Sequence, residues 1–171
     1  MPNKKYATKT GTLSFPHLSE PQELSNPSYT GYSCSIVFLL DDIEKYQWIV
    51  DLCKDLASQD SRTKGKTNLR MPYTTGEDSI TIKFKRKTEY GAPKCVDKSK
   101  TPLSSEEVSE RLYGGSQVRI AFSPYAYSNQ SSGVGLALEA VQLIGDGERI
   151  ATSNPSDVFE TIGPDSIDEL F

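Results

Sequence analysis

The segment Ser79–Arg86 limits the folds open to this chain more than any other part of the sequence. Its residues alternate between apolar and polar, and a period of two is typical of a β-strand with one buried face. The apolar positions are Ile80, Ile82 and Phe84, and the polar positions that follow the same alternation are Thr81, Lys83, Lys85 and Lys87. Such a row of lysines indicates either an edge strand protected against aggregation or a surface that binds an anion.

Five further segments favour strands because they are short, carry β-branched and aromatic residues, and are bounded by turn residues. They are residues 8–15, 32–40, 94–97, 116–127 and 134–144. Pro16 and Pro21 are expected to end the first of them, so that residues 16–31 form a loop. The last segment also has apolar residues at helical spacing, but Gly133 and Gly135 favour a strand there.

Two helices are expected between the strands. Asp41 or Asp42 can cap a helix that runs to about Ser58. Ser104 begins a capping-box sequence, which predicts a short helix before the last hairpin. The first helix has an apolar stripe formed by Ile43, Tyr46, Ile49, Val50, Cys53, Leu56 and Ala57. Trp48 lies beside this stripe, where packing at the helix margin accounts for it better than stacking on a base.

These elements predict a mainly β fold, a barrel of five to six strands with one helix after the second strand and a short second helix. Residues 1–150 are expected to form this domain and residues 151–171 a flexible acidic tail. No stretch approaches about 18 consecutive apolar residues, and the first residues show no signal-peptide pattern. A soluble protein that acts where it is made, with no membrane partner, is therefore expected.

The net charge of −4 conceals an asymmetry between the body of the chain and its end. Residues 1–150 hold all 19 Lys and Arg and 18 of the 23 Asp and Glu, a net of +1, whereas residues 151–171 hold five acids and no base. Within the body, residues 62–100 carry 11 bases and four acids, a local net of +7. This segment-level count favours a nucleic-acid partner, although the acidic composition of the whole chain would argue against one.

The basic segment is interleaved with aromatic residues, a combination that binds single strands without regard to sequence. Cations follow the phosphates, and rings stack on the bases. The candidate DNA-binding residues are Lys64, Lys66, Arg70, Tyr73, Lys83, Lys85, Lys87, Tyr90, Lys94, Arg119, Tyr125 and Tyr127. The acidic tail would compete with DNA for these cations and, once displaced, would offer its end to a partner protein. The residues of this partner-binding end are Asp165, Asp168, Glu169, Leu170 and Phe171.

The sequence contains no pattern for catalysis, for a cofactor or for a metal ion. It has no Gly-rich phosphate loop and no G-x-S-x-G segment. The single histidine, His17, and the cysteines Cys34, Cys53 and Cys95 lack the spacing of zinc ligands. The cysteines are expected to be buried, reduced thiols. A non-enzymatic protein with no cofactor and no metal is therefore expected.

Three segments resemble a known family, the bacteriophage single-stranded DNA-binding proteins with an OB fold. They are Lys9–Leu18 (KTGTLSFPHL), the turn Tyr113–Arg119 (YGGSQVR) and the strand Gly133–Ile144. The resemblance covers most of residues 6–150, and the acidic end with its Phe is similar to the tails of replicative single-stranded DNA-binding proteins. It implies sequence-independent binding of single strands in replication, recombination or repair, in the cytoplasm of the bacterial host. It also implies a tail that contacts phage or host replication proteins.

Two alternatives of other classes stay open. In the first, the chain is a non-enzymatic interaction module of a phage complex, and its basic face meets an acidic protein. In the second, it is a small enzyme with an unrecognised site. The sequence also leaves the oligomeric state open, a homodimer included, and it does not separate DNA from RNA.

Overall fold

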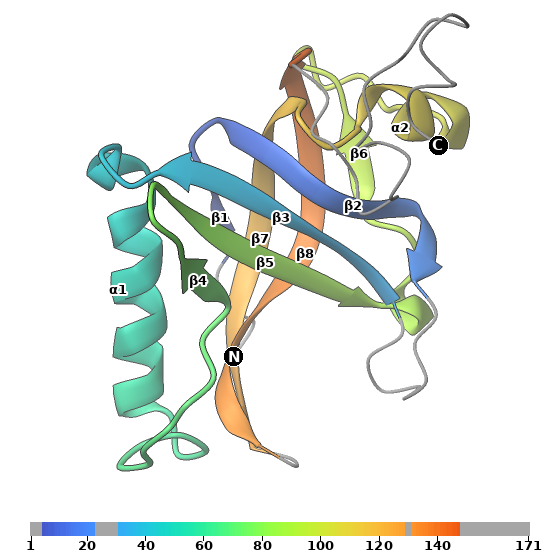
Figure 1. The fold of residues 1–171 in the computed structure, drawn as a ribbon. Coiled ribbons are helices and arrows are strands. Elements are labelled where there is room, and N and C mark those ends of the chain that lie inside the picture. Colours follow the sequence, from blue (N-terminus) through green and yellow to red (C-terminus); the bar gives the residue numbers. More distant parts are fainter. Residues whose placement is uncertain (1–4, 23–30, 129–130, 148–171) are drawn as a thin grey trace, which may run out of the picture.

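Five strands of the computed structural model close into a barrel (Figure 1). They are β2 (Gly11–Gln22), β3 (Gly31–Leu39), β5 (Ser79–Lys87), β7 (Gln117–Ser128) and β8 (Ser132–Gly145). Around the barrel, β2 pairs with β3, β3 with β5, β5 with β8 and β8 with β7, which returns to β2. The β5–β8 pair is parallel and the other four are antiparallel. The structure describes residues 5–22, 31–128 and 131–147.

Three short strands extend the barrel sheet. β1 (Tyr6–Ala7) pairs with β7, β4 (Tyr73–Thr75) with β5, and β6 (Lys94–Val96) with β8. The prediction of a mainly β barrel is confirmed, with eight strands in the described ranges instead of five or six. The two strands that the sequence did not predict are β1 and β4, because two or three residues are too few to show a period of two.

The alternation in β5 is borne out by the burial of its side chains. Ile80, Ile82 and Phe84 are at most 2% exposed and point into the barrel. The neighbouring strands supply matching apolar residues to the interior. These residues are Leu13, Cys34, Ile36, Phe38, Val118, Ile120, Phe122, Leu136, Leu138 and Val141. Each large side chain buried in this way stabilises the fold by roughly 1.5–3 kcal/mol, and the opposite face of β5 is left to solvent.

The helix α1 (Ile43–Gln59) covers β7 and β8 on one side of the barrel. Most of its predicted apolar stripe faces the core, but Ile43 is 54% exposed. Ile43 is the first residue of the helix, and its side chain leans towards the N-terminal end, away from the residues that pack below. Trp48 lies with its ring centroid 6.0 Å from those of Tyr6 and Phe122, which confirms packing at the helix margin.

The short helix α2 (Ser105–Arg111) begins with the predicted capping box. The Ser104 hydroxyl accepts a hydrogen bond from the Glu107 N–H at 3.2 Å, and the Glu107 carboxylate accepts one from the Ser104 N–H at 3.2 Å. These two bonds satisfy donors that the first turn of a helix otherwise leaves unpaired. Neither helix, nor the 3-10 turn Thr88–Tyr90, is long and apolar enough to cross a membrane, within the ranges that the structure describes.

The prediction that Pro16 and Pro21 end the first strand is wrong, because β2 continues through both to Gln22. β7 pairs with Gly11 and Thr12 of β2, so the later residues of β2 lie on an edge where proline sacrifices no ladder hydrogen bond. The register with β3 also shifts around the prolines. Phe15, with φ of 46°, is 67% exposed there, although alternation would place it with the buried Leu13.

The remainder of the predicted loop, residues 23–30, and the acidic tail lie outside the described residues. So do the boundary expected at residue 150 and the tail positions Asp165, Asp168, Glu169, Leu170 and Phe171. The described chain reaches Gly147, whose N–H donates to the Tyr113 hydroxyl at 3.1 Å and whose carbonyl accepts from it at 2.7 Å. The described part of the chain therefore ends beside Tyr113.

Candidate nucleic-acid interface

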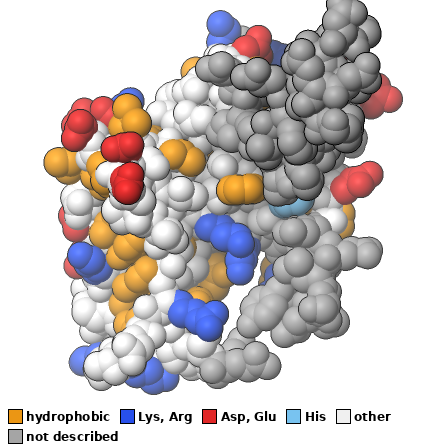
Figure 2. Space-filling model, in the orientation of Figure 1, with side chains coloured by type: hydrophobic (Ala, Val, Ile, Leu, Met, Phe, Trp, Pro, Cys, Tyr) orange, Lys and Arg blue, Asp and Glu red, His pale blue; other side chains and the backbone are white. Residues whose placement is uncertain are grey.

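The lysine row lies on the outside of the barrel, as the alternation predicts. Lys83, Lys85 and Lys87 are all exposed, and Figure 2 shows Lys and Arg side chains on this face of the molecule. On the next strand, β3, the register places Ser35 beside Lys83 and Ser33 beside Lys85. Serine side chains are too short to cover a lysine, so the neighbouring strand leaves the ammonium groups accessible.

The segment that precedes β4 brings Arg70 to the same face. The Arg70 N–H donates to the Ser132 carbonyl at 3.0 Å, and the Arg70 carbonyl accepts from the Val134 N–H at 2.9 Å. Two residues later, the Pro72 carbonyl accepts from the Lys83 N–H at 2.8 Å. These bonds fix the segment between the start of β8 and the middle of β5. Residues far apart in the sequence therefore form one basic cluster, Arg70, Lys83 and Lys85.

The charges of this cluster repel one another. Burial lowers the pKa of Lys85, and the positive charges of Lys83 and Arg70 lower it further. A lowered lysine pKa means that the fold disfavours the charged form of Lys85, although solvent screens much of this effect because the side chain is exposed. Among the ion pairs of the described residues, none involves Arg70 or Lys83. An anion bound here would relieve the repulsion.

Tyr125 and Tyr127 lie beside this cluster, at the hairpin end of β7. The ladder places Tyr125 opposite Gly135 and Tyr127 opposite Gly133 in β8, and the two ring centroids are 6.1 Å apart. A Cβ atom at Gly135 would overlap the Tyr125 ring, and one at Gly133 would overlap the Arg70 carbonyl oxygen. Because Gly133 and Gly135 have no side chain, the Tyr125 ring and the Arg70 backbone can pack directly on β8; we call these two glycines the glycine seat. Burial, and next the neighbouring Tyr127, raise the pKa of Tyr125.

The sequence contained a signal for this seat that the prediction did not use. Tyr-x-Tyr and Gly-x-Gly stand at equal distances on either side of the turn, so a tight hairpin must pair each tyrosine with a glycine. His17 is a further residue near the basic cluster that the candidate set does not include. It pairs with Ser33, and its pKa is lowered by burial and then by the charge of Lys83, which places it at the border of the basic cluster.

Four other predicted residues lie around this centre. Lys66 donates to the Ser132 hydroxyl at 3.2 Å, close to the hairpin, and Lys64 is exposed in the same loop. Lys87 ends the lysine row and lies 4.0 Å from Glu89. Tyr90 is 62% exposed in the turn that follows β5. The structure thus places these residues towards the two ends of the basic face.

The other three predicted residues are Tyr73, Arg119 and Lys94. Tyr73 packs against the core, and its pKa is raised by burial and then by Cys53 and Asp51 of α1. Arg119 donates to the Thr8 carbonyl at 2.8 Å. It is six residues from Tyr125 along β7, which corresponds to about 20 Å in a strand. Lys94 is paired in β6, opposite Ala140 of β8. The structure therefore separates Arg119 from the basic cluster. Tyr73 pairs with Ile82, next to Lys83, but packs against the core, and Lys94 is exposed on the strand that follows β5 along the edge of β8.

The three cysteines are buried and unpaired with one another. Burial raises the pKa of Cys53 to about 12 and that of Cys95 to about 11, and it also raises the pKa of Cys34. At neutral pH all three are thiols, which are poor nucleophiles and poor metal ligands. Among the residues that the structure describes, no three His, Cys, Asp or Glu gather into a possible metal site.

The strand order defines the class of protein. The barrel strands run β2, β3, β5, β8, β7 and back to β2, with the one parallel pair between the third and fifth strands along the chain. A closed five-stranded Greek-key barrel of this kind is an OB fold, so the fold that the resemblance implied is confirmed.

The chain belongs to the family described as the ssDNA-binding protein of Enterobacter phage Enc34, whose model matches residues 4–170. A structure of the bacteriophage Enc34 single-stranded DNA-binding protein in complex with ssDNA has a TM-score of 0.75 and 19% identity, covering 85% of this chain and 89% of that one. The bacteriophage T7 single-stranded DNA-binding protein gp2.5 has a TM-score of 0.66 and 18% identity, covering 95% and 98%. No curated protein matches the sequence.

Proposed function

We propose that this chain binds single-stranded DNA without sequence preference, through the face shared by the basic cluster and the two hairpin tyrosines. One observation carries the proposal. Mutually repelling cations (Arg70, Lys83 and Lys85) lie beside two aromatic rings seated on glycines. The cations would bind successive phosphates, and each ring would stack on a base with a gain of about 1–3 kcal/mol. Stacking needs no particular base, so binding without sequence preference is expected.

The position of this face in the barrel supports the proposal. OB folds bind oligonucleotides on the face of their second and third strands and through the loop between the fourth and fifth. In this chain those elements are β3 and β5, which carry the lysine row, and the β7–β8 hairpin, which carries Tyr125 and Tyr127. The Enc34 protein, with which the chain shares its fold, has been solved with ssDNA. A strand would run from the hairpin over Arg70 and along β5 to Tyr90.

We further propose that the chain acts in phage DNA replication, recombination or repair in the cytoplasm of the host, and that it binds without catalysing a reaction. Residues 151–171 would act as an acidic tail that competes with DNA for the basic cluster. Their five acids and lack of bases oppose the +7 charge of residues 62–100. Once DNA displaces the tail, Leu170 and Phe171 would be available to a replication protein.

A salt titration of oligo(dT) binding tests the proposal. Tight binding is expected at low salt. The logarithm of the affinity should fall linearly with the logarithm of the salt concentration, by about 0.7 for each phosphate contact. Fluorescence anisotropy of a labelled oligonucleotide measures both quantities. Micromolar or weaker affinity at low salt, or an affinity that salt does not change, would argue instead for an acidic protein as the partner of this face.

Deletion of residues 157–171 should tighten oligo(dT) binding by about fivefold at low salt, since a tethered competitor is removed. The matched control keeps the length and removes only the charge. It replaces Asp157, Glu160, Asp165, Asp168 and Glu169 with their amides. Both variants are expected to tighten binding to the same extent in the anisotropy assay. Unchanged or weaker affinity in both variants would contradict competition between the tail and DNA. Tighter binding in the deletion alone would mean that the volume of the tail, and not its charge, hinders DNA binding.

A further inference from the structure

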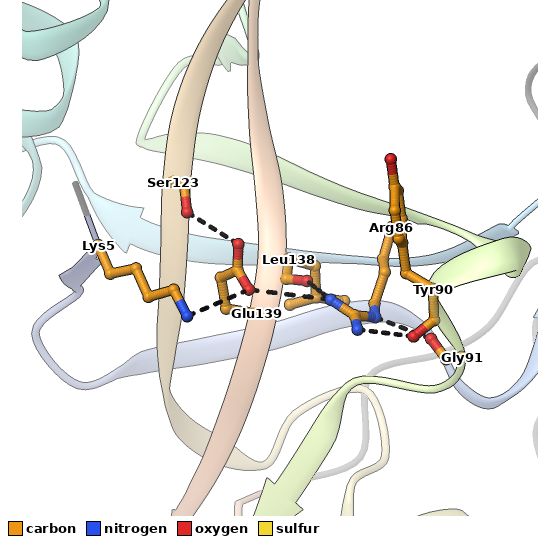
Figure 3. A network of polar contacts seen from close by, with 7 residues as sticks. All are labelled: Lys5, Arg86, Tyr90, Gly91, Ser123, Leu138 and Glu139. Atoms are coloured by element: carbon orange, nitrogen blue, oxygen red, sulfur yellow. Dashed lines mark hydrogen bonds and ion pairs between the residues drawn. The ribbon is translucent and has the colours of Figure 1, made fainter. Parts of the chain in front are cut away.

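Arg86 occupies a break in the hydrogen bonding along the edge of β8. β5 pairs with β8 at Ala137, and β6 takes over from Ala140, so Leu138 and Glu139 lie between the two partners. Arg86 Nη1 donates to the Leu138 carbonyl at 3.2 Å and lies 3.9 Å from Glu139 Oε2 (Figure 3). A side chain thus supplies a donor that neither strand provides. Arg86 is half-buried, whereas its neighbours Lys85 and Lys87 are exposed.

The same guanidinium holds the turn that follows β5. Arg86 Nε donates to the Gly91 carbonyl at 2.8 Å, and Nη2 donates to the Tyr90 carbonyl at 2.8 Å. The guanidinium carbon also lies 5.9 Å from the centroid of the Tyr90 ring. Gly91 has φ of 76°, a conformation that favours glycine. The turn is therefore fixed by the backbone of Gly91 as well as by the hydrogen bonds from Arg86. Figure 3 shows the Tyr90 ring standing beside Arg86 and away from Glu139.

Glu139 is itself fixed by two further contacts. It accepts a hydrogen bond from the Ser123 hydroxyl at 2.8 Å, and Lys5 Nζ lies 4.0 Å from its Oε2. Glu139 is the extra residue at a register shift in the β7–β8 ladder, which is why its side chain can reach across to Arg86. The Glu139 carboxylate therefore helps to orient the Arg86 guanidinium, and the guanidinium holds the turn at Tyr90 and Gly91.

We infer that Arg86, oriented by Glu139, is a positioning residue that holds Tyr90 as the base-stacking residue at the end of the lysine row. The inference rests on the proposed function. Tyr90 is exposed and stands three residues beyond Lys87, where a strand that follows the row would arrive. A ring on a free turn would lose conformational entropy on stacking, and a ring already held loses less. Arg86 thus acts through Tyr90, although it belongs to the basic segment of the sequence.

A double-mutant cycle tests the inference with the full chain and oligo(dT). Arg86→Gln should weaken binding about fivefold in the parent, and by less than about twofold when Tyr90→Leu is already present. A residue with a merely structural role would lower the melting temperature and weaken binding equally in both backgrounds. Equal losses in both backgrounds, or no loss in the parent, would overturn the inference.

Glu139→Gln provides a second route if Arg86→Gln does not fold. This variant leaves Arg86 in place and removes the charge that orients it, so a smaller loss is expected that again disappears with Tyr90→Leu. A loss that persists with Tyr90→Leu would overturn the inference. Failure of the parent to bind oligo(dT) would instead reject the proposed function. A parent that binds, with additive effects in the cycle, would reject only the positioning role.

Discussion

Replacing Lys83, Lys85 and Lys87 together with alanine is expected to weaken oligo(dT) binding by about 100-fold at low salt. The slope of log affinity against log salt concentration should become shallower by about 2. Each substitution would remove one phosphate contact, and with it the release of counterions that this contact causes. The melting temperature should stay close to that of the parent, because all three side chains are exposed and burial and neighbouring positive charges lower the pKa of Lys85. Anisotropy titrations at several salt concentrations, with a thermal melt of each variant, measure all three quantities.

The matched control removes three charges from segments outside the lysine row and the basic cluster. It combines Lys9→Ala, Lys98→Ala and Lys100→Asn. Lys9 lies in the connection between β1 and β2, and Lys98 and Lys100 lie in the turn after β6. Asparagine is chosen at position 100 because Lys100 has φ of 67°, which asparagine tolerates. This variant should keep most of the affinity. If it loses as much as the β5 variant, net charge governs binding. If neither variant changes affinity or slope, the lysine row is a protected edge and the proposed face is wrong.

Gly135→Ala is expected to weaken oligo(dT) binding by about 30-fold, which corresponds to the stacking of one base. The new methyl group would overlap the Tyr125 ring, which must leave its seat on β8. The ring is the end of a side chain and can move into solvent, so the barrel should melt close to the parent temperature. The effect should vanish when Tyr125→Leu is already present, since no ring is then left to displace.

Gly145→Ala is the matched control for this substitution. It lies on the same strand, and a Cβ there would meet no atom within 4 Å. Its affinity and melting temperature should both equal those of the parent. Should Gly135→Ala bind as tightly as Gly145→Ala, Tyr125 does not stack on DNA. Should it weaken binding equally with Tyr125→Leu present, the loss comes from the backbone of β8 and the stacking assignment fails.

The fold was largely readable from the sequence wherever a strand had one buried and one solvated face. The alternation of β5 predicted its first residue, its last residue to within one position, and the sides on which Phe84 and Lys85 lie, because the pleat sends successive side chains to opposite faces. The capping box at Ser104 was readable for a similar reason, since all its partners lie within one turn. The strand end predicted at Pro16 is wrong, because a proline breaks a strand only where a neighbouring strand would pair with the N–H that proline lacks.

The candidate site was readable only in part. Charge and aromatic counts predicted the basic segment and the hairpin tyrosines, and the alternation in β5 separated Lys85 from Arg86, but neither could show what Arg86 contacts. These neighbours point to opposite faces, and Arg86 is engaged with the carbonyls of Leu138, Tyr90 and Gly91. Arg119 was grouped with Tyr125 for the same reason, although its guanidinium is bound to Thr8. A count along the chain adds charges that the structure uses for different purposes.

The local properties of this protein follow from its sequence: the strands with a period of two, the capping box of α2, the lysine row and the acidic end. The predicted aspartate cap of α1 does not form, since Asp42 precedes the helix without a side-chain hydrogen bond to it. Each of these local properties depends on residues within a few positions of one another. The tertiary structure alone decided which of them meet. Closure of the barrel brings Arg70 beside Lys85 and next to the glycines that seat Tyr125 and Tyr127. These contacts join residues tens of positions apart, and their geometry is set by strand register and barrel closure, which no local pattern encodes.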